Sequence, residues 1–414
     1  MRINNVVRKL LGVTKIFTRN ITIGLGGLVF DLVPSWYKAR CGLCGRKCPG
    51  YDTSSVGRLW RHLSLGSVII WLRYTVRRVE CPVHGVTVEK VPWAEHDTRF
   101  TREMEEMTAY LAQRMDKTAV CTLMGINWRT VGAIVSRVVA ERLDPNRFQN
   151  LYVIGVDEIS YRRHHKYLSV VVDHAKRRVV WAAKGKSSDT LDGFFDELGP
   201  ERSKELTHVT MDMSQAFIST VKARAPGAQT VFDRFHVQHL ASDAVDEVRR
   251  AEYRLAVDDE AEADFIKGAR WALLKNPWNM TREEGAKLRD IAWSNRRIYR
   301  AYLLKETLAK ALDYRQPGRA RKLMDEWLAW ASRSRLVPFV KLARTIRKHK
   351  ENILAYIKTR LTNGLVEGLN NKIRLITRRA FGFHSSQALI SMVYLCCGGI
   401  TLNPPLPKPC HQPT

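Results

Sequence analysis

The sequence predicts an α/β protein with small modules ahead of its sheet and a long helical insertion within it. Three observations lead to this prediction. Two short apolar segments, 151–156 and 206–211, each end in an aspartate, as strands do at the ligand-binding edge of an α/β sheet. A set of metal-binding side chains precedes these strands. Residues 246–360, which follow them, have helical periodicity and almost no strand pattern.

Composition narrows the classes of partner. A chain of 414 residues is expected to hold about three domains of roughly 150 residues. Its net charge of +27 favours a polyanionic partner, because each Lys or Arg placed on a phosphate releases a bound counterion. No apolar run reaches the roughly 20 residues that span a bilayer, and the run at 21–33 lacks a cleavage site. We therefore expect a cytoplasmic, nucleoid-associated protein with reduced thiols and no membrane partner.

Residues 1–38 carry short β-like runs and predict only a structural lead-in.

The segment 39–98 predicts a zinc ribbon, because it holds two pairs of metal-binding side chains, each pair spaced by three positions. The four ligands are Cys41, Cys44, Cys81 and His84. A site closed by four protein ligands binds one Zn²⁺ structurally, because it leaves no position for a substrate.

Cys48 leaves a second interpretation of this segment open. Together with Cys41, Cys44 and Cys81 it could hold an iron–sulfur cluster. We favour zinc, because the imidazole of His84 is well placed after Cys81 and because Cys48 precedes a proline in a predicted loop.

Residues 99–148 predict a helix-turn-helix domain. A short helix at 118–124 is followed by a turn at Gly125, and a second helix begins at Trp128 with an apolar stripe of valines and isoleucine. Side chains on or near the free face of the second helix would face the major groove of DNA. They are Trp128, Arg129, Thr130 and Arg137. An ordinary helical hairpin has the same pattern, but the neighbouring zinc module and the charge of +27 favour DNA binding.

Residues 149–245 alternate strands and helices and predict the catalytic core. Three consecutive strands joined by short turns are followed by a helix, a strand, a helix and a strand. This is the order of a ribonuclease-H-like fold, in which the first and fourth strands lie side by side and set Asp157 against Asp212. Residues 246–360 predict an all-α insertion, and we expect its tryptophans mostly in the core.

A third acid, Glu367, lies in residues 361–400, which predict helices that complete the core; residues 401–414 predict a tail. Asn363 is suited to cap the helix that carries Glu367. Helical spacing places several polar side chains on the face of Glu367: Asn370, Asn371, Arg374 and Arg378. A lone acid in so basic a stretch is suited to hold a metal beside a bound phosphate. The basic residues expected to contact DNA here are Lys372, Arg374 and Arg378.

Three carboxylates suit the metal-dependent chemistry of phosphodiesters. Two Mg²⁺ or Mn²⁺ ions about 4 Å apart activate the attacking oxygen and stabilise the leaving oxygen, and such hard cations prefer oxygen ligands. We expect Asp157 to bridge two ions, and Asp212 and Glu367 each to complete the shell of one. Glu158 points to the opposite side of its strand and ranks below Asp157.

Motifs that recur in order along the chain point to one family. They are Cys41-x-x-Cys44, Cys81-Pro-x-His84-Gly85, Gly155-Val-Asp157-Glu158, Asp212-Met-Ser, Asp233-x-Phe-His236 and Asn363-Gly-x-x-Glu367-Gly-x-Asn370-Asn371-Lys372. Together they make the chain resemble the DDE transposases of the ISL3 insertion-sequence family over nearly its whole length.

The resemblance implies a catalytic triad of Asp157, Asp212 and Glu367, with supporting roles for His236 and Arg374. It implies that the zinc and helix-turn-helix modules bind the terminal inverted repeats of an element. The enzyme would cut the ends of the element and join the freed 3′-hydroxyls to target DNA. Synapsis of two ends favours a homodimer or a larger assembly. Two alternatives remain: a ribonuclease-H-like nuclease without strand transfer, and a transposase-derived regulator that binds DNA without catalysis.

Overall fold

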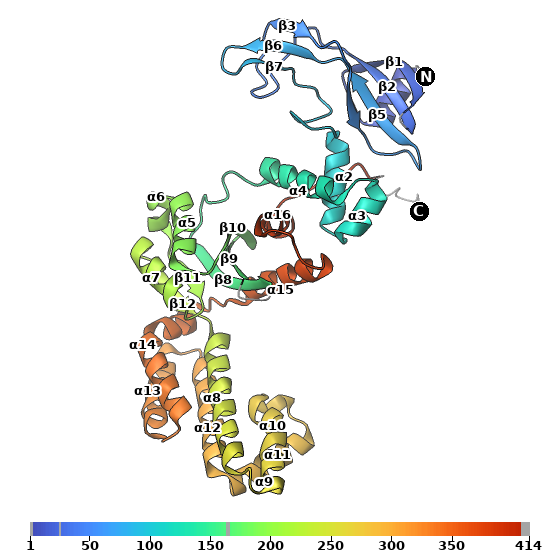
Figure 1. The fold of residues 1–414 in the computed structure, drawn as a ribbon. Helices are drawn as coiled ribbons and strands as arrows, with labels where there is room; N and C mark the ends of the chain where they lie inside the picture. Colours follow the sequence, from blue (N-terminus) through green and yellow to red (C-terminus); the bar gives the residue numbers. More distant parts are fainter. Residues whose placement is uncertain (1–2, 25, 163–165, 407–414) are drawn as a thin grey trace, which may run out of the picture. The chain divides into compact units, whose positions relative to one another are not determined.

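The computed structural model describes residues 3–24, 26–162 and 166–406, and the chain folds as two compact units. The first unit comprises the residues up to Asp144 and from Leu375 onward, and the second runs from Pro145 to Arg374. Figure 1 shows the elements of both units. Residues 407–414 of the predicted tail lie outside the described part of the chain.

The first unit opens with two small sheets. Their elements are α1 (Ile3–Leu11), β1 (Ile16–Gly24), β2 (Gly27–Pro34), β3 (Gly50–Thr53), β4 (Arg58–Arg61), β5 (Ile69–Tyr74), β6 (Arg77–Cys81) and β7 (Gly85–Val88). One sheet has the order β1-β2-β5-β4, and β3, β6 and β7 form the other. Because β2 pairs with β5, the predicted lead-in shares a sheet with residues of the predicted zinc ribbon. Trp60, Leu72 and Trp93 lie in the core that holds this sheet to α1.

The helix-turn-helix follows, with α2 (Arg102–Ala112), α3 (Lys117–Met124) and α4 (Trp128–Arg142). Asp116 and Asn127 cap α3 and α4 by accepting main-chain N–H groups. Gly125 ends α3 in the left-handed conformation, with a φ of 59°. These three local signals explain why the predicted turn forms where it does.

The helix α16 (Ser386–Cys397) packs against this module. Leu395 lies in the same core as the buried valines of α4, and Gln113 donates from its side chain to the main-chain oxygen of Leu395 over 2.7 Å. The sequence predicts that residues 361–400, which include α16, complete the catalytic core, whereas the apolar face of α16 packs against the helix-turn-helix.

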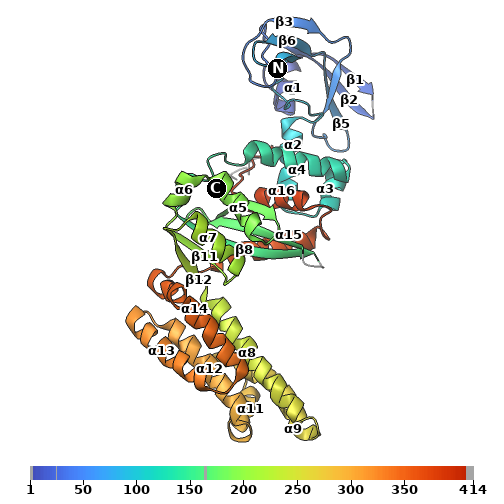
Figure 2. The ribbon, with the colours of Figure 1, turned by 60° about the vertical axis from the view of Figure 1, so that its left-hand side comes forward.

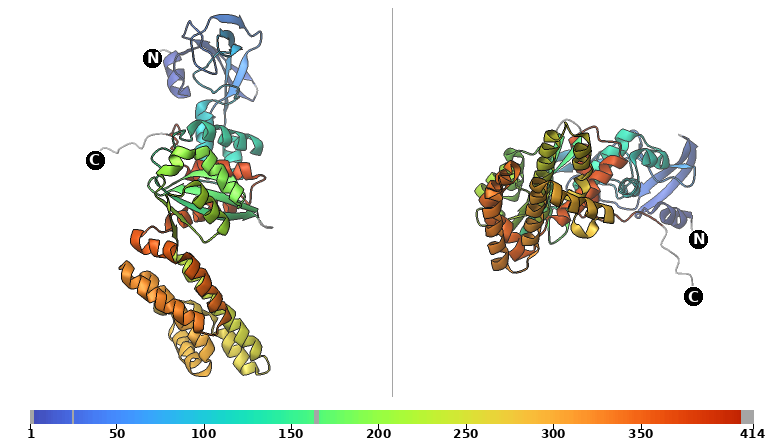
Figure 3. Two further views of the ribbon diagram at one scale, coloured as in Figure 1. Left: turned by 90° about the vertical axis from the view of Figure 1, so that its left-hand side faces the viewer. Right: turned by 90° about the horizontal axis from the view of Figure 1, so that it is seen from below.

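The second unit contains a mixed sheet flanked by helices. Its first elements are β8 (Val153–Arg162), β9 (Lys166–Asp173), β10 (Arg178–Lys184), α5 (Ser188–Leu198), α6 (Pro200–Glu205), β11 (His208–Met211), α7 (Gln215–Arg224) and β12 (Gln229–Phe232). The sheet order is β10-β9-β8-β11-β12, antiparallel from β10 to β8 and parallel from β8 to β12. The first and fourth strands are neighbours, as the sequence predicts. Figure 3 shows α5 and α7 over one face of the sheet.

The insertion is all helical. Its elements are α8 (Arg234–Leu255), α9 (Glu260–Gly268), α10 (Arg270–Leu274), the 3₁₀ turn η1 (Pro277–Asn279), α11 (Arg282–Ser294), α12 (Arg296–Asp313), α13 (Pro317–Arg333) and α14 (Val337–Thr359). Helices α8, α12, α13 and α14 pack side by side (Figure 2), and α14 returns the chain to β12. The helix α15 (Gly364–Arg379) follows.

The insertion places its tryptophans differently from the prediction. Trp327 is buried, but Trp271, Trp278 and Trp293 are exposed, the last of them by 89%. The short helices α10 and α11 bury few side chains, since Ile291 is the one buried residue in α11. Their tryptophans therefore have no core to enter, and the prediction that they are mostly internal is wrong.

Among the described residues, no single helix is both long and apolar enough to cross a bilayer. Helices α3 and α4 reach that length only as a pair bent by 99°.

Candidate active site and metal centre

Three aspartates form a row across the parallel strands. The pairs Val209↔Ile154 and Thr210↔Gly155 set the register between β11 and β8, and two further steps place Asp212 opposite Asp157. The pair Met211↔Phe232 between β11 and β12 is followed in the same way by Asp212 and Asp233. Carboxylates from three separate segments therefore gather where β11 and β12 end, which is the usual position of ligands in α/β sheets.

Side-chain alternation decides the face on which Asp157 lies. Ile154 and Val156 enter the core beneath α5 and α7. The backbone of Gly155 faces the opposite way, and a Cβ added there would overlap the Val366 side chain of α15. Asp157 shares the face of Gly155, and Glu158 lies on the other face.

Asp157 is held at both carboxylate oxygens. Its Oδ2 accepts from the side-chain amide of Asn370 over 2.6 Å, and its Oδ1 accepts from the N–H of Glu158 over 2.8 Å. Burial raises the pKa of the Asp157 carboxyl, and the charge of Asp212 raises it further, against the lowering effect of these two donors. The site thus holds two neighbouring carboxylates that repel each other.

Asp212 and Glu367 complete the predicted set of acids. Oδ1 of Asp212 accepts from the N–H of Ser214 over 2.9 Å, which fixes the loop after β11. Glu367 lies exposed in the first turn of α15. It lines a cavity of about 210 Å³ together with Asp157. The other lining residues are Asp233, Phe235, His236, His239, Asn363, Asn370 and Arg374.

His236 joins the same cavity from the first turn of α8. Its Nδ1 lies 3.8 Å from Oδ2 of Asp233, whose side chain caps α8 by accepting the N–H of Phe235. The nearby carboxylate of Asp233 raises the pKa of His236, and the charges of Asp212 and Asp157 act in the same direction. The imidazolium form is therefore favoured beside the acids.

The acids fit a divalent cation by their chemistry. Among the described residues, no Lys or Arg forms an ion pair with Asp157, Asp212 or Glu367. A partly buried pair of carboxylates without a cation is unfavourable, and oxygen ligands of this kind suit Mg²⁺ or Mn²⁺. Asp157 and Glu367 line the cavity, and Asp212 follows β11 beside Asp157 without lining it. The three acids do not converge on one point, since within the described ranges only the cysteine cluster brings three candidate ligand atoms within 4.8 Å.

That cluster is the predicted zinc site. The ligand atoms of Cys41, Cys44, Cys81 and His84 all lie within 4.8 Å of one another. Sγ of Cys44 lies 3.7 Å from Sγ of Cys81, and Nδ1 of His84 lies 3.6 Å from the latter. Zn–S bonds of about 2.3 Å in a tetrahedron place two sulfurs about 3.8 Å apart. The residues present therefore fit one tetrahedral Zn²⁺.

Main-chain N–H groups stabilise the thiolate form of one zinc ligand. The N–H of Val83 lowers the pKa of the Cys81 thiol to about 6, so that the thiolate forms readily. The thiol of Cys48 is buried and donates to the main-chain oxygen of Arg46, outside the set of four. A set with three sulfurs and one imidazole favours zinc over the iron–sulfur alternative.

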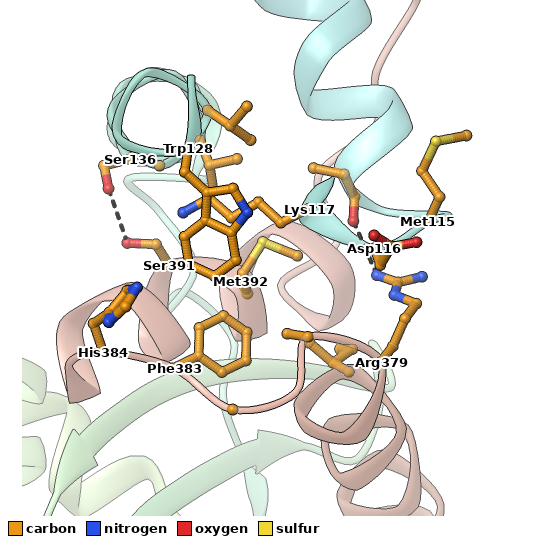
Figure 4. A pocket seen from close by; sticks show the side chains of 18 residues that line it. Met115, Asp116, Lys117, Trp128, Ser136, Arg379, Phe383, His384, Ser391 and Met392 are labelled. Carbon is orange, nitrogen blue, oxygen red and sulfur yellow. Dashed lines mark hydrogen bonds between the residues drawn. The ribbon is translucent and has the colours of Figure 1, made fainter. Parts of the chain in front are cut away.

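Two of the predicted DNA-contacting residues make contacts inside the helix-turn-helix. Figure 4 shows the Trp128 side chain at a small apolar pocket. Its ring lies 4.2 Å from Nζ of Lys117 and 5.1 Å from the ring of His384. Arg137 forms an ion pair with Glu105 of α2.

The remaining predicted contacts lie at the surface. Arg129 is exposed, and Thr130 bonds to the capping side chain of Asn127. On α15, Lys372, Arg374 and Arg378 are all exposed, and Arg374 donates to the side chain of Asn371. Contact of any of these residues with DNA stays a prediction.

The structure gives two asparagines contacts that the sequence does not predict. Asn370 is predicted on the exposed face of its helix, but it is buried against Asp157. Asn363 is predicted as a cap, but its side-chain oxygen accepts from the hydroxyl of Thr210. The close approach at Gly155 is the signal that could have located them, since it brings α15 onto β8.

Comparisons with known proteins agree on one family. Residues 154–393 match the ISL3-type DDE model described as transposase, residues 89–139 the helix-turn-helix domain of transposase family ISL3, and residues 38–84 the zinc finger of transposases IS204, IS1001, IS1096 and IS1165. The transposase for insertion sequence element IS1557 of Mycobacterium tuberculosis is 44% identical over 87% of this chain and 86% of its own length. The transposase for IS1001 of Bordetella parapertussis is 28% identical over 84% and 86%, respectively.

Proposed function

Because the chain belongs to the ISL3 family of insertion-sequence transposases, we propose that Asp157, Asp212 and Glu367 form the catalytic triad of a ribonuclease-H-like core. The observation that carries the proposal is the cavity that Asp157 and Glu367 both line. The parallel pairing of β11 with β8 brings the end of β11 beside Asp157, and the charge of Asp212 acts on the Asp157 carboxyl. The strand order β10-β9-β8-β11-β12 supports the assignment of the core.

The triad would hold two Mg²⁺ or Mn²⁺ ions, with Asp157 shared between them. When bound, the ions would lower the pKa of the attacking oxygen and neutralise the charge that develops on the phosphate. The chain's own donors keep the acids in place: the amide of Asn370 on Asp157 and the N–H of Ser214 on Asp212.

In cleavage, a water oxygen would bond to phosphorus at the end of the element as the bond to the 3′-oxygen breaks. In strand transfer, the oxygen of the freed 3′-hydroxyl would bond to a target phosphorus as the bond from that phosphorus to the target's own 3′-oxygen breaks. The proton of the attacking hydroxyl would pass to solvent, and the leaving 3′-oxygen would take up a proton from solvent. His236 lines the cavity, and the neighbouring acids raise its pKa, so that its protonated form would contact the scissile phosphate. Arg374, two turns after Glu367, would hold the neighbouring phosphate by a charge-assisted bond, and Lys372 and Arg378 would follow the backbone.

Recognition of the element's end would use a groove in the first unit. This groove, of about 850 Å³, lies between β4 and the turn before α4. Arg58, Arg61 and Arg99 line it, with Asp97 as its one acid among the described residues. Arg61 is already bonded to the main-chain oxygens of Met124 and Gly125, so it holds the groove together.

Arg99 is left to contact DNA, because it is exposed and forms no ion pair among the described residues. The positive end of the α4 dipole adds to its field, which suits a phosphate backbone. Arg129 and Thr130 would then reach base edges from the start of α4. Since two ends must be joined in one reaction, we propose that the active assembly contains at least two copies of the chain.

Cleavage of a labelled duplex that carries the element's own end tests the triad. In Mg²⁺, the wild type should cut and transfer the strand, while Asp157→Ala, Asp212→Ala and Glu367→Ala should bind DNA and cut at least about 10³-fold more slowly. Glu201→Ala, at an exposed acid on α6, is the matched control and should cut normally.

The other outcomes separate the alternatives. Cutting without joining would favour a nuclease, and binding without cutting in Mg²⁺ or Mn²⁺ would favour a regulator. Cutting that survives all three substitutions would place the active site elsewhere.

A further inference from the structure

The side chain of Asn370 is one of the most buried polar groups of the second unit. It is 1% exposed, and its Nδ2 lies 2.6 Å from Oδ2 of Asp157. An ionised carboxylate can only accept, so the amide nitrogen must face Asp157 and the amide oxygen must point away. That oxygen, Oδ1, is buried and has no partner among the described residues. A buried acceptor without a hydrogen-bond partner lowers the stability of the folded state. We therefore look for a role of this side chain other than stabilising the fold.

The helix that carries Asn370 is anchored to the sheet close by. The hydroxyl of Thr210 donates to Oδ1 of Asn363, the residue before α15, over 2.8 Å. The same hydroxyl lies 2.9 Å from Nε2 of His174. The side chain of Val366 packs against the backbone of Gly155, where no Cβ is present. These contacts fix the first turn of α15 relative to β8 and β11.

One turn of α15 then serves two purposes. Glu367 is directed to the cavity, and Asn370, three residues later, is directed to Asp157. Because residues three apart are neighbours on a helix, the position of Asn370 on Asp157 also sets how far Glu367 stands from it. The amide of Asn370 therefore fixes the position of Glu367 relative to Asp157.

The choice of an amide has a chemical reason. A Lys or Arg at this position would form an ion pair with Asp157 and compete with a divalent cation for the carboxylate. A neutral donor orients the carboxylate and leaves its charge for the metal. Partners of this kind behind a metal ligand typically change metal affinity by about 10- to 100-fold.

We propose that Asn370 is the positioning residue of the active site, which orients the Asp157 carboxylate for binding of divalent cations. This inference rests on the proposed function of Asp157. Asn370 acts through Asp157 and does not itself touch the reacting phosphate.

The test measures Mn²⁺ binding to the full chain without DNA, from the electron paramagnetic resonance signal of free Mn²⁺. Asn370→Ala should raise the dissociation constant about 10-fold or more. Asn370→Ser, whose hydroxyl is too short to reach the carboxylate, should behave like the alanine variant. Asn276→Ala is the control, because Asn276 is exposed in the helical insertion and does not line the cavity, and it should keep the wild-type constant.

A second measurement is the Mg²⁺ concentration that gives half-maximal cleavage of the labelled end. Asn370→Ala should need more Mg²⁺ and recover cleavage at high Mg²⁺, with unchanged DNA affinity and unfolding temperature. A purely structural role predicts the reverse, with a lower unfolding temperature and an unshifted Mn²⁺ constant, and that result would overturn the proposal.

Failure of this inference is distinguishable from failure of the triad. If Asp157→Ala abolishes Mn²⁺ binding and cleavage while Asn370→Ala changes neither, only the role of Asn370 is lost. If Asp157→Ala cleaves like the wild type, the proposed function itself is wrong, and the inference falls with it.

Discussion

Thr210 on β11 donates its hydroxyl to Oδ1 of Asn363 over 2.8 Å, across 153 positions of sequence and the whole helical insertion. The contact is buried, and it joins the strand that ends at Asp212 to the residue that begins α15. A single hydrogen bond thus ties the segment with the second acid to the segment with the third.

Replacing Thr210 with Val tests that tie. The substitution keeps the shape but removes the donor, and it leaves Asn363 unsatisfied in a buried position. We expect a loss of about 1–3 kcal/mol in the free energy of unfolding, measured by urea denaturation. Thr230→Val on β12, whose hydroxyl makes no such bond among the described residues, should cost less than about 0.5 kcal/mol. Equal effects of the two substitutions would contradict a special role for the bond.

Gly155→Ala should displace α15. The added Cβ would overlap the Val366 side chain and lie 2.9 Å from Nε2 of His174, and both are packed. We expect slower cleavage with unchanged binding of the element's end, and a loss of about 1–3 kcal/mol in stability. Val366→Ala in the same chain should restore part of both. Gly318→Ala, where nothing lies within 4 Å, is the control and should be neutral or slightly stabilising.

Zinc should copurify at one ion per chain and depend on the four predicted ligands. Cys44→Ser should lose it, because a hydroxyl is a poor ligand for zinc. Cys48→Ser should keep it, because that thiol lies outside the set of four. Elemental analysis of the purified variants measures this. Iron with visible absorbance in the wild type, lost in the Cys48 variant, would support a cluster in place of zinc.

His62 should make the first unit sensitive to acid. Burial lowers the pKa of this imidazole from about 6.5 to about 4, and its Nδ1 lies 2.9 Å from the hydroxyl of Thr101. The native state therefore binds the proton less readily than the unfolded chain. The neutral, buried His62 contributes fully to the free energy of unfolding above pH 6.5. As the pH falls toward 4 this contribution is lost, by about 3 kcal/mol in all.

Comparison with His62→Gln isolates this effect. Urea denaturation at several pH values should show the advantage of the wild type shrinking between pH 6.5 and pH 4. A constant difference across that range would mean that His62 does not titrate as its burial requires. Because acid also releases zinc, the zinc content of both proteins is measured at each pH.

Arg99→Ala should weaken binding of the element's end several-fold at moderate salt. If Arg99 neutralises one phosphate, the negative slope of log K against log salt should become shallower by about 0.9 in the variant. Arg114→Ala, at an exposed arginine in the turn after α2 that does not line the groove, should leave both quantities unchanged. An unchanged slope in the Arg99 variant would place the DNA outside this groove.

Local features of the site could be predicted because they depend on neighbours in sequence. The pairs Cys41/Cys44 and Cys81/His84 are each spaced within one turn, so their pattern alone predicts a shared metal. The strand that carries Asp157 and the caps before α3 and α4 follow from hydrophobic period and capping residues. The prediction that this strand ends at Asp157 is wrong, because its antiparallel pairing with β9 extends β8 to Arg162. The order of strands likewise predicted that the first and fourth would be neighbours.

The remaining features depend on contacts between distant segments, which no local pattern encodes. Helical spacing put Asn370 with the exposed side chains, but packing of α15 onto Gly155 buried it against Asp157. Hydrophobicity put Trp293 in a core, but α11 has too little apolar surface to form one. By itself the sequence determined which side chains carry the chemistry, since that is a matter of residue type and spacing. Only the tertiary structure decided which of them meet, because strand register and helix docking are set by the whole packed chain.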